Sequence, residues 1–293
     1  MNRNRTIRKA VIPAAGFGTR FLPITKAQPK EMLPIIDKPV IQYVVEEAVE
    51  AGITDILMII GKGKRSIEEY FDRNYELEKD LEIKNKSEEL TVIRRISDLA
   101  NIHFIWQKEL NGLGDAVAYA RYHVGNEPFA VLLGDTLIDA PTPLLRQLSD
   151  IYDKYGESVV ALEEVDPKNV SRYGVIGGNA IETDLYQITQ LIEKPTPEEA
   201  PSNLVFAGRY IFKPEIFDCI AQTQPGINNE IQLTDAMKRM IQKSNLYGLK
   251  FDGKRYDIGN KIDFLKTNIV YGLRRDDIAG ELAQFIRDCQ TGE

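Results

Sequence analysis

Apolar residues recur first at strand spacing and then at helix spacing. Residues 9–14 form a short run rich in Val and Ile, which predicts a strand, and a glycine-containing loop over 15–22 follows at once. After Pro39, apolar side chains lie three and four residues apart, which predicts an amphipathic helix ending at Gly52. The nearly continuous apolar run 53–60 predicts a parallel strand covered on both faces. The chain therefore starts with a β-loop-α-β unit.

The alternation resumes after one charged interruption. Residues 76–98 predict a helix or hairpin with a solvated charged face. Further strands are expected at 103–107, 129–133 and 159–162, and further helices at 113–123 and 143–155. Beyond Arg172 the pattern predicts an antiparallel or mixed portion with strands at 173–176, 185–192 and 205–212, helices at 215–221 and 231–244, and a helical tail at 261–273 and 278–289. Strands alternating with helices indicate an α/β fold with a mixed, mainly parallel sheet flanked by helices.

Composition narrows the function classes. The 293 residues carry 37 Lys and Arg against 44 Asp and Glu, a formal net charge of −7, which argues against a general nucleic-acid or anionic-membrane binder. No apolar stretch is long enough to span a membrane, and the basic N-terminus lacks the apolar region of a secretion signal. Two cysteines without a metal-binding pattern fit a reducing compartment. We expect a single cytoplasmic domain, since no repeat or flexible linker divides the chain.

The loop after the first strand carries the sharpest chemical signal. Residues 14–23 read AAGFGTRFLP, and the small side chains would let backbone N–H groups approach an anion. Arg20 adds positive charge. The loop fails as a dinucleotide fingerprint because Phe21 stands where the third glycine would fall, and it does not match a P-loop. The residues predicted to bind phosphate or nucleotide here are Ala14, Ala15, Gly16 and Gly18.

The loop and the blocks that follow it resemble the sugar-nucleotide pyrophosphorylases, a family of sugar nucleotidyltransferases. The resemblance covers nearly the whole chain. It recurs in order at residues 107–109 with 112–114, 133–135, 172–175, 193–195, 207–210, 230–235 and 255–259. It implies a Rossmann-like fold, with a nucleotide-binding half over about 1–140, a sugar-phosphate half over 141–260 and C-terminal helices over 261–293. It further implies joining of an NTP, here UTP, to a sugar 1-phosphate, here glucose 1-phosphate, and a homo-oligomer, either dimer or tetramer.

Two carboxylates are candidate metal ligands. Asp135 follows a buried strand and Asp257 follows Tyr256 late in the chain, so both could meet at one edge of the sheet. Mg²⁺ takes one or two carboxylates together with substrate phosphates and water. A Gly-Asp pair after a strand is by itself more often a turn, and the resemblance is what implies Mg²⁺ at this pair.

The resemblance also implies the substrate contacts. It assigns sugar hydroxyls to Glu193, the sugar phosphate to Lys194 and the triphosphate to Arg20 and Lys26. Gln107 offers both a donor and an acceptor to the pyrimidine edge. The remaining predicted substrate-binding residues are Gly112, Gly114, Gly174 and Gly208.

Two positions depart from the pattern common in the family. Asp115 stands where a His is common, and Thr136 where a second Asp is common. UTP is therefore expected over TTP or CTP by likeness alone, and galactose or an N-acetylhexosamine phosphate could replace glucose 1-phosphate. A nucleotide-dependent oxidoreductase and a non-catalytic nucleotide-sugar-binding subunit are the rival classes.

Overall fold

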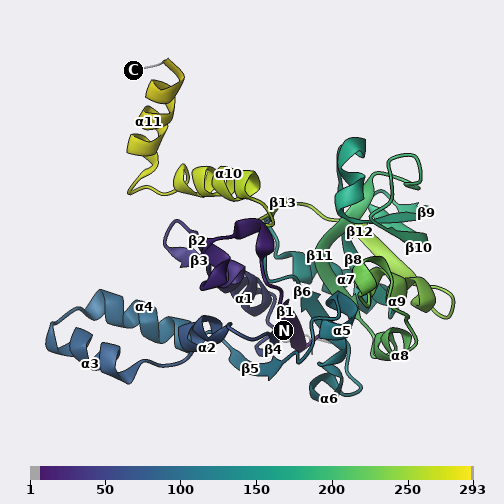
Figure 1. Cartoon of the computed structure of the whole chain (residues 1–293), viewed down its shortest axis with the longest axis horizontal. Coiled ribbons are helices and arrows are strands. Elements are labelled where there is room, and N and C mark those ends of the chain that lie inside the picture. The colour runs from purple at the N-terminus through teal and green to yellow at the C-terminus, as the bar shows by residue number, and fades with distance from the viewer. Residues whose placement is uncertain (1–6, 292–293) are drawn as a thin grey trace.

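A computed structural model describes residues 7–291 (Figure 1). Residues 1–6 and 292–293 lie outside this part. The expectation that the basic N-terminus holds no secretion signal therefore concerns residues that are mostly outside the described range. None of the helices within 7–291 has the length and apolar character needed to cross a membrane.

A nine-stranded mixed sheet runs through the molecule. Its order is β5 (Asn101–Trp106), β4 (Asp55–Ile60), β1 (Lys9–Ala14), β6 (Phe129–Leu132), β11 (Leu204–Phe212), β8 (Ser158–Glu164), β12 (Leu246–Lys250), β10 (Leu185–Glu193) and β9 (Gly174–Glu182). In this sheet β11 and β10 run opposite to the other strands. The predicted mixed, mainly parallel α/β sheet is confirmed, and the parallel neighbours β5, β4, β1 and β6 come from the N-terminal half.

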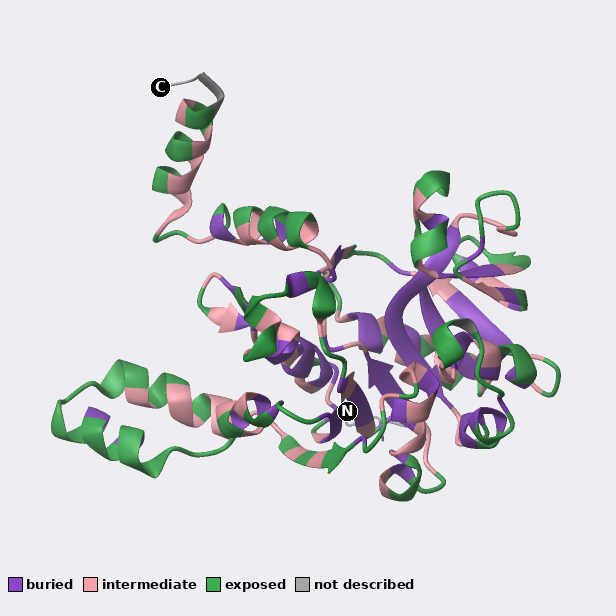
Figure 2. Ribbon diagram, viewed as in Figure 1, coloured by how far each residue is buried: buried purple, intermediate pink, exposed green. Residues whose placement is uncertain are grey.

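Helices cover both faces of the sheet. One face packs against α1 (Val40–Glu50) and α7 (Leu144–Tyr155), and the other against α5 (Leu113–Ala118), α8 (Ile216–Ala221) and α9 (Leu233–Met240). Strand β1 serves both cores, because Ala10 and Ile12 face the first cluster and Val11 the second. Figure 2 shows the buried residues concentrated on these strands.

The charged interruption is helical. After α2 (Arg65–Phe71), helices α3 (Tyr75–Ile83) and α4 (Ser87–Ser97) extend away from the sheet as an exposed pair (Figures 1 and 2). No residue of α4 is buried, so its charged face is solvated as predicted. The predicted helical tail is also present, as α10 (Lys261–Gly272) and α11 (Ala279–Thr291).

Several elements differ from the sequence-based expectation. The predicted helix at 113–123 is interrupted after Ala118 and resumes as α6 (Arg121–Val124), and the one at 231–244 is shorter, as α9. Strands β12, β7 (Thr136–Asp139) and β13 (Lys254–Asp257) were not predicted, nor was the two-residue ladder of β2 (Pro34–Ile35) and β3 (Lys38–Pro39). Short runs such as KRYD lack the apolar pattern of a core strand. The β7–β13 ribbon places Asp257 opposite Thr136.

A buried ion pair fixes the turn between β6 and β7. Arg209 is fully buried on β11, and its guanidinium donates to both carboxylate oxygens of Glu47 on α1, at 2.7–3.1 Å. The same guanidinium donates to the backbone oxygens of Leu133 at 3.3 Å and Thr136 at 2.8 Å. Both ends of the segment that carries Asp135 are therefore held by one side chain.

Glu47→Gln should destabilise the fold by about 3–5 kcal/mol, because it leaves the Arg209 charge buried without its partner. Urea unfolding should show a lower midpoint with an unchanged slope. Glu50→Gln, at the exposed end of the same helix, is the matched control and should change the midpoint little. The Glu47→Leu, Arg209→Met double variant should be more stable to urea than Glu47→Leu alone, because no buried charge is left without a partner. A double variant that is less stable than Glu47→Leu would contradict this account.

Candidate active site

A cavity of about 520 Å³ opens at the carboxyl ends of β1, β6 and β5. Parallel strands bring the loops that follow them to one edge of the sheet, where α/β proteins commonly bind ligands. Among the predicted residues, those that line the cavity are Ala15, Gly16, Gly18, Gln107, Gly112 and Asp135. Lys30, Glu31 and Glu230 also line it, although the sequence analysis assigned them no role.

Lys30 is the cation that meets Asp135. The two side chains form an ion pair, in a region where each is about one-fifth exposed. Burial alone would raise the pKa of Asp135, but the attraction of Lys30 outweighs burial and holds that pKa below its ordinary value. Burial likewise opposes the charge of Lys30, yet Asp135 and Glu31 raise its pKa overall. Both groups therefore stay charged at neutral pH, and the pair is lost as pH falls through the lowered Asp135 pKa.

A second buried pair supports this cation. Glu31 and Lys64 are nearly inaccessible to solvent, and their side chains are 2.8 Å apart. Glu31 also lies 4.0 Å from Lys30. Glu31 thus shares its negative charge between two lysines, of which Lys30 lines the cavity.

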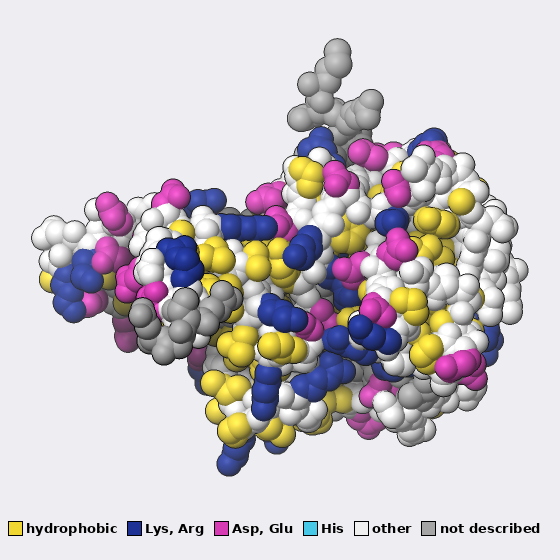
Figure 3. Space-filling view, turned by 90° about the horizontal axis from the view of Figure 1, so that it is seen from above, with side chains coloured by type: hydrophobic (Ala, Val, Ile, Leu, Met, Phe, Trp, Pro, Cys, Tyr) yellow, Lys and Arg dark blue, Asp and Glu magenta, His cyan; other side chains and the backbone are white. Residues whose placement is uncertain are grey.

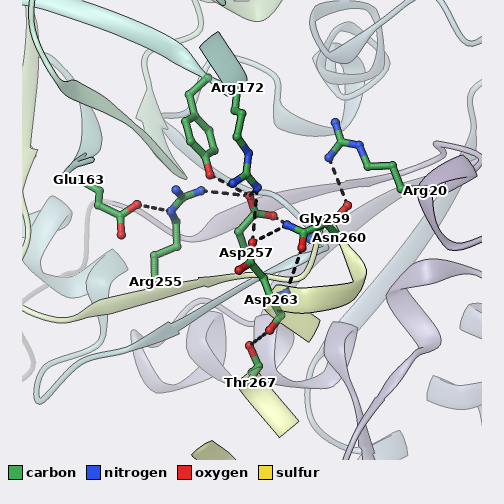
Figure 4. A network of polar contacts seen from close by, with 10 residues as sticks. Arg20, Glu163, Arg172, Arg255, Asp257, Gly259, Asn260, Asp263 and Thr267 are labelled. Atoms are coloured by element: carbon green, nitrogen blue, oxygen red, sulfur yellow. Dashed lines mark hydrogen bonds and ion pairs between the residues drawn. The ribbon is translucent and has the colours of Figure 1, made fainter. Parts of the chain in front are cut away.

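Asp257 is held by a separate network (Figure 4). Its carboxylate accepts from the Tyr173 hydroxyl at 3.2 Å and from the Gly259 N–H at 2.8 Å, and Arg172 approaches it within 3.5 Å. Arg255 lies over the Tyr173 ring and is paired with Glu163 at 2.6 Å.

Asp135 and Asp257 come from adjacent backbone. The backbone N–H of Ile258 donates to the carbonyl oxygen of Asp135 at 3.1 Å. Across residues 7–291 no cluster of three or more His, Cys, Asp or Glu side chains forms a metal site by itself. Two hard carboxylates that leave further positions to phosphate and water still match the ligands of Mg²⁺.

Tyr173 joins Asp257 to the predicted sugar-phosphate pair. Its carbonyl oxygen accepts from the backbone N–H of Lys194 at 3.0 Å. Lys194 has a φ of 48°, a conformation that few non-glycine residues adopt, and its ammonium lies 3.1 Å from Glu193. The other Glu193 oxygen accepts from the Thr234 hydroxyl at 2.6 Å.

Two predicted glycines give this region its close packing. A Cβ on Gly174 would come within 2.9 Å of Thr234 and even nearer Phe206. Gly208 has a φ of 79°, and its carbonyl oxygen accepts from the N–H of Leu133 at 3.0 Å, just before Asp135.

Among the predicted residues within 1–140, four lie outside the cavity lining. Ala14 is buried within β1. The backbone N–H of Gly114 donates a hydrogen bond to the Ile231 carbonyl oxygen at 2.8 Å. Arg20 donates to the Gly259 carbonyl at 3.2 Å, beside Asp257 (Figure 4). Lys26 is exposed. The structure thus brings Arg20 to the carboxylates, whereas Lys30, four residues beyond Lys26, contacts Asp135.

Cations lie beside both carboxylates: Lys30 pairs with Asp135, and Arg172 approaches Asp257. Figure 3 shows lysine and arginine side chains gathered across the middle of one face, although the whole chain is acidic. A glycine-containing loop after the first strand, two carboxylates at the same sheet edge and these local cations define an α/β protein built to bind phosphorylated ligands.

Comparison with known proteins identifies the family. Residues 9–271 match the model of the nucleotidyl transferase family, and the chain belongs to that family of transferases. It is 51% identical to a UTP–glucose-1-phosphate uridylyltransferase of Staphylococcus epidermidis, over 97% of this chain and 98% of the relative.

Solved structures agree in fold. A UDP-glucose pyrophosphorylase complexed with UDP-glucose is 45% identical, with a TM-score of 0.85 over 92% of this chain and 100% of that chain. A UTP-bound UGPase from Acinetobacter baumannii is 37% identical, with a TM-score of 0.89 over 96% of this chain and 99% of that chain. The resemblance noted in the sequence is confirmed.

Lys30→Met should lower kcat/KM by about 100-fold or more, the scale for losing a charge in a water-poor site. Lys26→Met should change it less than about tenfold, because exposed charges contribute little. Steady-state kinetics of both variants, with circular dichroism to confirm folding, measures the difference. Equal losses would place Lys26 in the site as the sequence predicted.

Proposed function

We propose that this chain transfers a uridylyl group from UTP to glucose 1-phosphate, forming UDP-glucose and releasing pyrophosphate. The relative and the solved structure with this activity in their names, at 51% and 45% identity, support this assignment. The observation that carries it is the continuous set of contacts from the Lys30–Asp135 pair in the cavity, through Ile258, Asp257 and Tyr173, to Lys194.

The nucleophile needs no general base. A phosphate monoester has a second pKa near ~6 and is largely dianionic at pH 7. One of its oxygens attacks the α-phosphorus of UTP in line, the new P–O bond forms as the bond to pyrophosphate breaks, and pyrophosphate leaves with the electron pair. No side chain becomes covalently linked to the substrate. The work of the site is to bring two polyanions together.

Cations of the chain perform that work. Arg20 and Lys30 would neutralise the triphosphate. Lys194 would bind the phosphate of the sugar 1-phosphate, and Glu193 would accept hydrogen bonds from the sugar hydroxyls. The sequence analysis also assigned Lys26 to the triphosphate, but this side chain is exposed, and the Lys26→Met variant described above tests that assignment. Family enzymes generally use Mg²⁺, which Asp135 and Asp257 would hold here. Bound there, the metal would withdraw charge from the phosphate oxygens.

The remaining contacts divide between the two halves of the chain. Residues 1–140 would bind the nucleotide, with Ala14, Ala15, Gly16 and Gly18 approaching phosphate or base, and Gln107, Gly112 and Gly114 approaching the pyrimidine. Residues 141–260 would bind the sugar phosphate, with Gly174 and Gly208 letting the sugar lie against the backbone.

We also propose that the enzyme acts in the cytoplasm as a homo-oligomer, either a dimer or a tetramer. Exposed apolar side chains on the tail support the oligomer, among them Ile262 and Leu265 on α10 and Phe285 on α11. The C-terminal helices would then serve assembly rather than chemistry.

A substrate panel tests the proposed function. Pyrophosphate release should be fastest with UTP and glucose 1-phosphate when five NTPs are crossed with glucose, galactose and N-acetylhexosamine 1-phosphates. Faster release with another NTP or another sugar 1-phosphate would support nucleotidyl transfer but show that the assigned substrate is wrong. No turnover with any pair, while UTP still binds, would indicate a non-catalytic binding subunit.

Asp135→Asn should weaken metal binding in the UTP complex about tenfold or more, because a charged ligand is replaced by a neutral one. Electron paramagnetic resonance of Mn²⁺ titrated into protein and UTP gives the affinity without turnover. Asp139→Asn, at the far end of β7, is the control and should bind Mn²⁺ as the wild type does. Unchanged affinity in Asp135→Asn would remove this carboxylate from the metal site.

A further inference from the structure

Gln107 is fixed by two neighbours that can only accept hydrogen bonds. Its side-chain Nε2 donates to Asp115 Oδ2 at 2.7 Å and points to the Gly112 carbonyl oxygen at 3.5 Å. A carboxylate and a backbone carbonyl have no proton to give, so the amide nitrogen must face both of them. The two donor positions of the amide are therefore directed into the protein.

The backbone holds both partners in place. The N–H of Gln107 donates to the Ile60 carbonyl at 2.8 Å, which fixes it at the end of β5. Asp115 follows Gly114, whose N–H is bonded to the Ile231 carbonyl and whose missing Cβ would come within 2.8 Å of that same oxygen. Gln107 is only 6% exposed and lines the cavity, whereas Asp115 is not among the lining residues.

We propose that Asp115 is a positioning residue that selects the pyrimidine by locking the amide of Gln107. This inference rests on the proposed function, in which Gln107 contacts the base. With Nε2 held by Asp115, the side chain offers the base its carbonyl oxygen, and not the donor and acceptor together that the sequence analysis expected. Uracil presents an N3–H donor to such an acceptor. Cytosine presents a lone pair at the same position and is repelled.

Asp115→Asn tests this directly, because asparagine has the same shape but can also donate. The Gln107 amide can then turn over and offer its NH₂ to the base. We expect the UTP-to-CTP ratio of kcat/KM to fall about tenfold, the scale of one buried hydrogen bond. The loss should appear mainly as a higher KM for UTP, with kcat and the melting temperature little changed. Glu109→Gln removes a nearby exposed charge and should leave the ratio unchanged.

A double-mutant cycle separates positioning from a direct or long-range electrostatic effect. If Asp115 acts through Gln107, Asp115→Asn should add almost nothing to the loss of discrimination in Gln107→Leu. Additive losses, or an unchanged ratio in Asp115→Asn, would overturn the inference while leaving the proposed function intact. A wild-type enzyme that does not use UTP would refute the proposed function and this inference with it.

Discussion

The guanidinium of Arg209 ties three parts of the molecule to one point. It crosses from β11 to Glu47 on α1 and holds the carbonyls on either side of Asp135. Desolvating such a pair costs several kcal/mol, so its presence is weak evidence of added stability. Its effect on the geometry is clear. The Arg209 side chain donates to two backbone carbonyls of the turn after β6, and it cannot move without losing its pairing with Glu47. The position of Asp135 is therefore set by the core and not by the surface loop around it.

The same logic governs charge at the cavity. An acidic chain cannot attract two anionic substrates through its net field, so it must place a few cations where the phosphates would bind. Lys30 remains charged there because Asp135 and Glu31 compensate its burial. Glu31 in turn is balanced by Lys64. Local pairing thus keeps Lys30 charged beside Asp135 although the protein as a whole is acidic.

Much of the fold could be predicted from the sequence because core strands such as β1 and β4 are continuous apolar runs, and α1 and α7 carry clear stripes. The β7–β13 ribbon could not, since its short polar strands are defined by pairing with each other. The glycine loop and Gln107 were found at the cavity because they directly follow strands. Lys30 was missed because charge and spacing alone do not distinguish it from Lys26. The contact to Asp135, 105 residues away, exists only after folding.

Tyr173 shows how the proposed metal carboxylate and the proposed sugar-phosphate lysine can be coupled without a mobile element. Its hydroxyl binds Asp257 and its carbonyl binds the backbone of Lys194, whose positive φ would be unfavourable in an isolated strand end. Arg255 packs over the ring and is itself anchored by Glu163. The proposed metal carboxylate and the proposed sugar-phosphate lysine therefore share one rigid support. A shift of that ring would move both groups together and so keep the spacing between them constant.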